Sequence, residues 1–164
     1  MIFGGGFPRE PSIVGKQAAQ RAIFHVQREL ETIAIHQCCA SLALCDRGTI
    51  DGAAYWPGPV EEFWSAVGTT QELEFARYAA VIHLRTPPAD QGYNYSNKLR
   101  IETAAEAQQV DERILRAWEG HPRRFIVQND PEFWLKAGRT LELVRSLLPS
   151  CCRAQRHSSA PAPT

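Results

Sequence analysis

The chain has 164 residues, of which 44% are apolar and 22% are charged, so it is long enough for one globular domain with a sizeable core. Its 18 basic and 18 acidic residues give a formal net charge of zero, which excludes a protein held to nucleic acid or to an anionic membrane by a global field. No run approaches the roughly 20 apolar residues of a transmembrane segment, and the first residues lack a secretory signal, so we expect a cytoplasmic protein.

The two ends of the chain differ in composition from its middle. Residues 1–16 open with a stretch rich in glycine and proline, which is typical of a loop. Residues 149–164 are rich in Ser, Ala and Pro and have no periodic apolar face, so we expect a disordered tail there. One α/β domain is therefore predicted over residues 17–148.

The first regular element of this domain is a helix. Apolar residues recur at steps of three and four over residues 17–37, which predicts an amphipathic helix. Its apolar positions are Ala19, Ala22, Ile23, Val26, Leu30 and Ile33. Its charged positions, Arg21, Arg28, Glu29 and Glu31, are expected to face solvent.

Two apolar runs, residues 40–45 and 79–84, have the length of buried parallel strands. Between them, residues 59–67 and 70–78 are predicted to form two short helices separated at Gly68.

The five cysteines do not have the spacing of a metal site. They occur as Cys38-Cys39, Cys45 and Cys151-Cys152, without a C-x-x-C pair and without histidines at zinc-finger distances. Free thiols are therefore expected, with Cys45 buried as a small apolar residue in its strand.

The second half of the domain carries clear helix signals. Thr103 and Glu106 have the spacing of a capping box, and Gly120 is placed to end the helix that follows. The apolar face of this helix is Ala107, Val110, Ile114 and Trp118, and Trp118 is expected to be structural. Residues 125–127 form a third predicted strand.

A last helix is predicted from Asp130 as N-cap and Pro131 as first helical residue, with Pro149 at its end. Its predicted inner face is Trp134, Ala137, Leu141, Val144 and Leu148. Strands that alternate with helices in this way indicate a three-layer α/β fold with a parallel sheet.

The most informative motif is Asp46-Arg47-Gly48 with Asp51, directly after the first predicted strand. Open parallel sheets bind ligands at the carboxyl ends of their strands, so this motif predicts a nucleotide site. The sequence contains no phosphate-binding loop of the form G-x-x-x-x-G-K-[ST], because Gly4-Gly5-Gly6 has no Gly-Lys-Ser/Thr behind it and Gly15-Lys16 is followed by Gln17.

Several segments together resemble a known family. They are Gly4-Gly5-Gly6-Phe7-Pro8-Arg9, the run from Gln20 to Glu31, Asp46-Arg47-Gly48 with Asp51, Gly92-Tyr93-Asn94 with Arg100, and His121-Pro122-Arg123-Arg124. In these segments the chain resembles AAA-type P-loop ATPase or kinase domains related to the NadR nicotinamide-riboside kinase, over residues 4–148. The resemblance implies a P-loop NTPase-like α/β fold that is incomplete here, with its first strand and Walker A loop missing from the amino-terminal side.

The resemblance also implies roles for the motif residues. Asp46 resembles the Walker B acid, which would hold Mg²⁺ with ATP or GTP, with a helix or turn cap after the strand as the alternative. Arg47 is expected to clamp an anionic substrate, with an ion pair to Asp51 as the alternative. Asp51 is a candidate general base or supporting acid, although a simple helix cap is the role that we expect first.

Three further residues are candidates for binding nucleotide or phosphate. Lys98 and Arg100 lie where related kinases carry a mobile lid, although solvated loop charges would have the same pattern. Asn129 follows the last predicted strand, where loops that contact the base occur in this fold class, although a role beside Asp130 at the start of the next helix is the one that we expect first.

The predicted function is an ATP/GTP-binding NTPase or small-molecule kinase-like domain, impaired by the absence of the Walker A loop. The first alternative is a non-catalytic pseudoenzyme or interaction module, which self-associates or binds a protein partner through the gap in its sheet. The second alternative is a binder of phosphate or phosphoinositide headgroups through its arginines.

Overall fold

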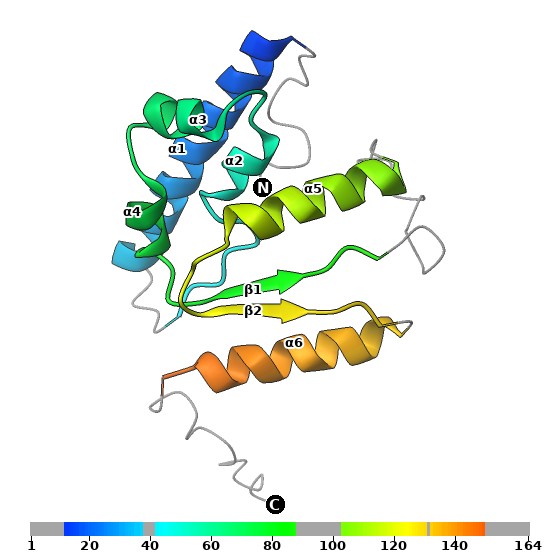
Figure 1. The fold of residues 1–164 in the computed structure, drawn as a ribbon. Coiled ribbons are helices and arrows are strands. Elements are labelled where there is room, and N and C mark those ends of the chain that lie inside the picture. Colours follow the sequence, from blue (N-terminus) through cyan, green and yellow to red (C-terminus); the bar gives the residue numbers. More distant parts are fainter. Residues whose placement is uncertain (1–11, 38–41, 88–102, 131, 150–164) are drawn as a thin grey trace, which may run out of the picture.

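The fold is that of a computed structural model, which describes residues 12–37, 42–87, 103–130 and 132–149 (Figure 1). The elements, in chain order, are α1 (Ile13–Gln37), α2 (Asp51–Tyr55), α3 (Val60–Val67), α4 (Gln71–Phe75), β1 (Val81–Leu84), α5 (Ala104–Ala117), β2 (Arg124–Val127) and α6 (Phe133–Leu147). No helix in these ranges is long and apolar enough to cross a membrane.

The sheet consists of β1 and β2, which pair in parallel with Val81 opposite Arg124 and Leu84 opposite Val127. Helix α5 lies along one face of this pair and α6 along the other, while α1 to α4 gather on the same side as α5 (Figure 1). The arrangement is an α/β fold with a small parallel sheet in the part of the chain that is described. The larger three-layer sheet stays a prediction.

The prediction of a strand over residues 40–45 is wrong for residues 42–45, the part that the structure describes. Residues 42–45 are irregular, Leu44 is 73% exposed, and Cys45 is exposed rather than buried. A strand needs a neighbour for its backbone N–H and C=O groups, and within the described ranges no strand pairs with this segment. Apolar composition alone therefore does not make it a strand.

Helix α1 ends where the periodicity predicts, but it begins four residues earlier than expected. The Ser12 hydroxyl accepts a hydrogen bond from the Gly15 amide at 3.1 Å, as an N-terminal capping residue does. Its buried face was predicted wrongly. Leu30 and Ile33 are 47% and 46% exposed, whereas Phe24, Gln27 and Glu31 are buried.

The helices between the two predicted strands are shorter than expected, and α2 was not predicted at all. Gly68 ends α3 with a φ of 73°, a left-handed conformation that favours glycine. Thr70 caps α4 by accepting a hydrogen bond from the Leu73 amide.

Helix α5 confirms the predicted capping box. The Thr103 hydroxyl accepts from the Glu106 amide at 3.2 Å, and the Glu106 carboxylate accepts from the Thr103 amide at 2.7 Å. Gly120 follows with a φ of 91°. The strands β1 and β2 lie within one or two residues of their predicted bounds.

Helix α6 differs from its prediction at its start and on its inner face. Glu132 is the N-cap, and the Asp130 carboxylate instead accepts a hydrogen bond from the Glu132 amide at 3.0 Å. Pro131 lies outside the described residues. Trp134 is 80% exposed and Leu141 is 55% exposed. A two-stranded sheet covers only a narrow stripe of a helix, so these side chains find no cover among the described residues.

Two small apolar clusters form the core. Phe24, Trp56, Phe63 and Val67 join α1 to α3, and Ile50, Ala54, Ile114 and Trp118 join the start of α2 to α5. Ile50 is a member of the second cluster, so the core fixes the place of the predicted nucleotide motif that contains it.

Candidate functional site

The turn formed by residues 46–51 is held by backbone contacts from two directions. The Gln27 side chain of α1 donates to the Arg47 carbonyl at 2.9 Å, and the Thr49 amide donates to the Tyr78 hydroxyl at 2.8 Å. Gly48 lies against the indole of Trp118, so a Cβ at this position would be 2.4 Å from Cζ2 of that ring. Glycine is required at position 48 for this close approach.

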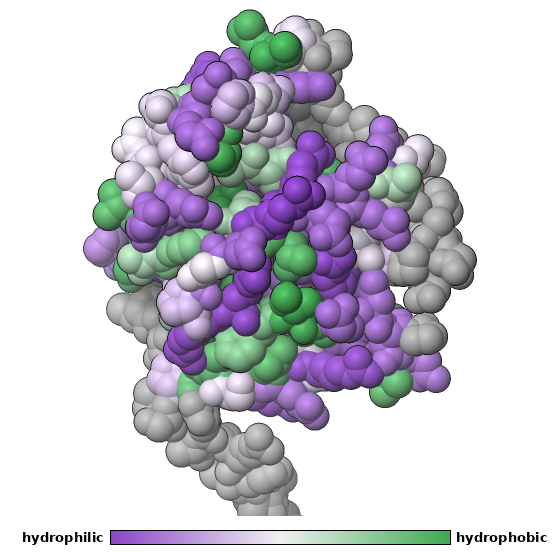
Figure 2. Space-filling view, in the orientation of Figure 1, coloured by the Kyte–Doolittle hydropathy of each residue, from purple (hydrophilic) through white to green (hydrophobic). Residues whose placement is uncertain are grey.

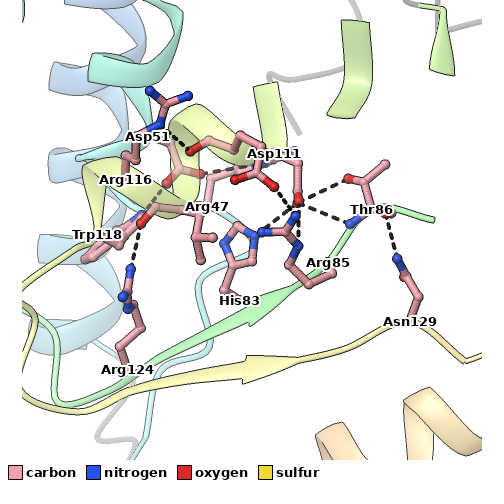
Figure 3. Close-up of polar contacts among 12 residues, drawn as sticks. Arg47, Asp51, His83, Arg85, Thr86, Asp111, Arg116, Trp118, Arg124 and Asn129 are labelled. Carbon is pink, nitrogen blue, oxygen red and sulfur yellow. Dashed lines mark hydrogen bonds and ion pairs between the residues drawn. The ribbon is translucent and has the colours of Figure 1, made fainter. Parts of the chain in front are cut away.

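Asp51 is the most constrained acid of the turn (Figure 3). Its Oδ1 accepts from Nε1 of Trp118 at 2.6 Å, and its Oδ2 lies 3.4 Å from Nη1 of Arg47. Burial raises the pKa of Asp51, while the indole N–H and the Arg47 guanidinium oppose this rise. The alternative interpretation of Arg47, an ion pair with Asp51, is confirmed. Asp51 is the first residue of α2 and not its N-cap, so the simple cap interpretation is wrong.

The prediction that Asp46 ends a strand is wrong, because residues 42–45 are irregular. Asp46 and the Arg47 side chain lie on the outside of the same turn. Asp46 is exposed, and the Arg47 side chain is 46% exposed. Within the described ranges, no group of three or more His, Cys, Asp or Glu residues is arranged to hold a metal ion. A nucleotide-bound Mg²⁺ needs only one or two carboxylates because phosphates and water complete its shell, and the exposed Asp46 fits that requirement.

A second polar cluster occupies the carboxyl end of β1 (Figure 3). The buried Asp111 of α5 accepts from Nε2 of His83 at 3.0 Å and from the Thr86 amide at 3.1 Å. Its other oxygen lies 3.0 Å from Nε of Arg85. This cluster was not predicted. Two features of the sequence could have indicated it. His83 lies within an apolar strand, and Asp111 lies on the apolar side of a predicted helix.

Asn129 links the ends of the two strands. Its Nδ2 donates to the Thr86 carbonyl at 2.7 Å, and its Oδ1 accepts from Nζ of Lys136 at 2.9 Å. Lys136 also donates to the Arg85 carbonyl, and its burial lowers its pKa. The sequence analysis does not identify Lys136, because it predicts the inner face of this helix from apolar residues alone.

Lys98 and Arg100 lie outside the described residues, as does the segment Gly92-Tyr93-Asn94. The structure therefore does not bring them to the turn or separate them from it, and the lid stays a prediction.

A buried ionic network joins α1 to α4 beside the turn. Glu74 is 1% exposed; its carboxylate accepts from Nη1 of Arg28 at 3.1 Å and from the Thr49 hydroxyl at 2.8 Å. Glu31 accepts from Nη2 of Arg77 and from the Tyr78 hydroxyl, each at 2.7 Å. The prediction that Arg28 and Glu31 belong to a solvated face is wrong, since both make ion pairs with residues of the α4 region.

Comparison with known proteins gives one finding. A family model described as an AAA domain matches residues 9–133, more than half of the chain. No curated protein and no solved structure matches the chain. The matched range contains the turn of residues 46–51 together with Asp111 and Trp118.

Proposed function

The chain belongs to the AAA domain family, and from this premise we propose that it binds a nucleoside triphosphate, with Asp46 and Arg47 facing the phosphates. The family match supports a nucleotide-binding, P-loop-like function at the level of the family. A relation to NadR-type kinases, and phosphoryl transfer to a small acceptor, belong to the proposal.

The observation that carries the proposal is the turn of residues 46–51. It presents the exposed carboxylate of Asp46 next to the half-exposed guanidinium of Arg47. Hydrogen bonds from Gln27 and to Tyr78 hold the backbone of this turn. A planar guanidinium binds phosphate oxygens in pairs, and a turn that is already rigid loses little entropy on binding them.

Asp46 would hold Mg²⁺ with ATP or GTP. When bound, the ion neutralises phosphate charge. Arg47 would add positive charge on the same side. Asp51 already accepts from Trp118 and pairs with Arg47, so we assign it the task of holding Arg47 rather than that of a general base.

Three outer residues complete the proposal. Lys98 and Arg100 would supply lid cations over the phosphates, as the sequence predicts. Asn129 would act by keeping the ends of β1 and β2 together next to the nucleotide, because its amide already bonds to the Thr86 carbonyl and to Lys136.

The sequence lacks a Walker A loop, so we propose that binding is weak. That loop normally supplies a cradle of backbone N–H groups, a lysine and a hydroxyl for Mg²⁺. Arg47 then supplies a larger share of the contact with phosphate.

The test is calorimetric titration of the full chain with Mg·ATP and Mg·GTP, repeated on Arg47→Met and Asp46→Asn. Arg47→Met is expected to weaken binding by at least about tenfold, the value of one charge-assisted hydrogen bond. Asp46→Asn is expected to remove the dependence on Mg²⁺. Arg145→Met is the control, because Arg145 is an exposed arginine near the end of α6. Equal affinities for wild type and Arg47→Met would contradict the proposal.

A non-catalytic interaction module is the second candidate, because large apolar side chains reach the surface. Trp134, Leu44 and Phe133 are 80%, 73% and 70% exposed. Figure 2 shows apolar residues in green between hydrophilic ones in purple on one face of the molecule. For such a module, Mg·ATP leaves the melting temperature unchanged, and sedimentation detects association of the chain as its concentration rises.

A further inference from the structure

Arg47 is held at its backbone by a residue distant in the sequence. The Gln27 amide that donates to the Arg47 carbonyl also donates to Oε1 of Glu31 at 2.8 Å. Gln27 is only 8% exposed, so this contact is shielded from water. The start of the Arg47 side chain is therefore fixed relative to α1.

The direction of the guanidinium depends on Asp51. An arginine side chain that is 46% exposed would otherwise sample several rotamers, and an exposed ion pair alone orients it weakly. Asp51 is different from a surface acid because it is buried and its Oδ1 accepts from the indole N–H of Trp118 at 2.6 Å. The carboxylate therefore cannot rotate away from Arg47 without breaking that bond.

Trp118 is itself immobilised. It is 3% exposed, it stacks on Phe75 with ring centroids 6.0 Å apart, and it meets the Tyr78 ring edge to face at 5.1 Å. Its indole reaches Asp51 across Gly48, where a side chain would collide with the ring. Two distant parts of the chain therefore meet here: Trp118 contacts Asp51 and Gly48, and Asp51 pairs with Arg47. Figure 3 shows Trp118, Asp51 and Arg47 together.

We propose that Trp118 is a positioning residue for Arg47, which it orients through Asp51. The inference rests on the proposed function, because it takes Arg47 as the group that binds phosphate. It also gives a role to the indole N–H of the tryptophan at the end of α5.

Loss of the indole N–H acts on Asp51 in a definite direction. Burial raises the pKa of Asp51, and the Trp118 bond is the first of the contacts that oppose this rise. Without that bond the pKa of Asp51 rises further, and a neutral carboxyl group attracts the guanidinium less than a carboxylate does.

The test compares Trp118→Phe with Trp56→Phe in the full chain. Trp56 is an apt control because it is also buried, and its indole N–H has no hydrogen-bond partner among the described residues. NMR spectra of the arginine side chains are recorded, and the Arg47 signal is assigned by its loss in Arg47→Lys. In wild type and in Trp56→Phe, we expect the Arg47 signal to be separate from the signals of exposed arginines. In Trp118→Phe, we expect it to move to the position of exposed arginines. An Arg47 signal that stays in place in Trp118→Phe overturns the inference.

A second readout is the affinity for Mg·ATP. It is expected to fall on the order of tenfold in Trp118→Phe and to stay unchanged in Trp56→Phe. If wild type does not bind Mg·ATP, the proposed function fails, while the NMR comparison still decides whether Trp118 orients Arg47.

Asp51→Asn covers the case in which Trp118→Phe does not fold. Its amide oxygen still accepts from Trp118, but its NH₂ group faces the Arg47 donors and cannot hold them. The Arg47 signal must then move to the position of exposed arginines. A signal that remains in place in this variant overturns the inference.

Discussion

Two neighbouring segments of the chain, on either side of Asp46, have opposite environments. Residues 42–45 are apolar, yet Leu44 is 73% exposed. Residues 49–51 include Thr49 and Asp51, yet all three residues are buried. Hydrogen-bond partners decide the difference. Thr49 bonds to Glu74 and Tyr78, and Asp51 accepts from Trp118. Residues 42–45 have no neighbouring strand in the described part of the chain. Hydropathy alone predicts the opposite, with residues 42–45 buried and residues 49–51 exposed.

The largest effect is expected from removing the buried acid that holds Thr49. Glu74→Ala leaves Arg28 and Arg77 without their shared carboxylate, so the free energy of unfolding should fall by about 4 kcal/mol. Urea unfolding measures this change. Glu142→Ala, at an exposed position of α6, is the control and should leave the urea midpoint unchanged. Equal midpoints for the two variants would show that the network contributes nothing.

Truncation of one apolar residue in each segment tests the comparison directly. Ile50 is 0% exposed and belongs to the cluster with Trp118, so Ile50→Ala should cost about 3 kcal/mol. Leu44→Ala should cost less than about 0.5 kcal/mol because the side chain is already in water. Thermal unfolding of both variants gives the two values. A large loss at Leu44 would mean that residues 42–45 are buried in solution.

Overfilling the turn should have an intermediate effect. Gly48→Ala places a Cβ 2.4 Å from the Trp118 ring, and we expect a loss of about 2 kcal/mol as the indole is displaced. Gly138→Ala is the matched control, because nothing lies within 4 Å of a Cβ there. That control should gain up to about 1 kcal/mol from helix propensity. Equal stability of Gly48→Ala and wild type would contradict the close contact.

The smallest effect is expected in the pH dependence of stability. Because the pKa of Asp51 is raised in the folded state, the stability it contributes is complete below about pH 3.9 and is lost as the pH rises through the folded value. Asp51→Asn removes this group. The stability of wild type relative to Asp51→Asn should therefore fall as the pH rises from about 4 toward neutrality. Urea unfolding across this range measures it, and a difference that grows with pH would contradict the assignment.

Much of the local structure could be predicted from the sequence. The end of α1, the capping box of Thr103 and Glu106, the end of α5 near Gly120 and the positions of β1 and β2 depend on residues a few places apart. The candidate turn could also be located, since Asp46, Arg47 and Asp51 are one short motif. The Arg47–Asp51 ion pair is likewise local, since the two positions are four residues apart.

The remaining features depend on residues that only the tertiary structure brings together. The partner of Asp51 is Trp118, 67 positions away, and the partners of Gln27 and Glu31 come from the turn and from the region after α4. These contacts decide which face of α1 is buried, because a polar side chain enters a core only where another group satisfies its hydrogen bonds. Residues 42–45 show the converse, since apolar composition does not bury a segment for which no partner strand is present among the described residues. The sequence by itself thus determined the capping box of α5, the positions of β1 and β2 and the motif of residues 46–51. The tertiary structure decided burial and the orientation of Arg47, because capping and periodicity act over one turn and hydrogen-bond satisfaction acts across the whole fold.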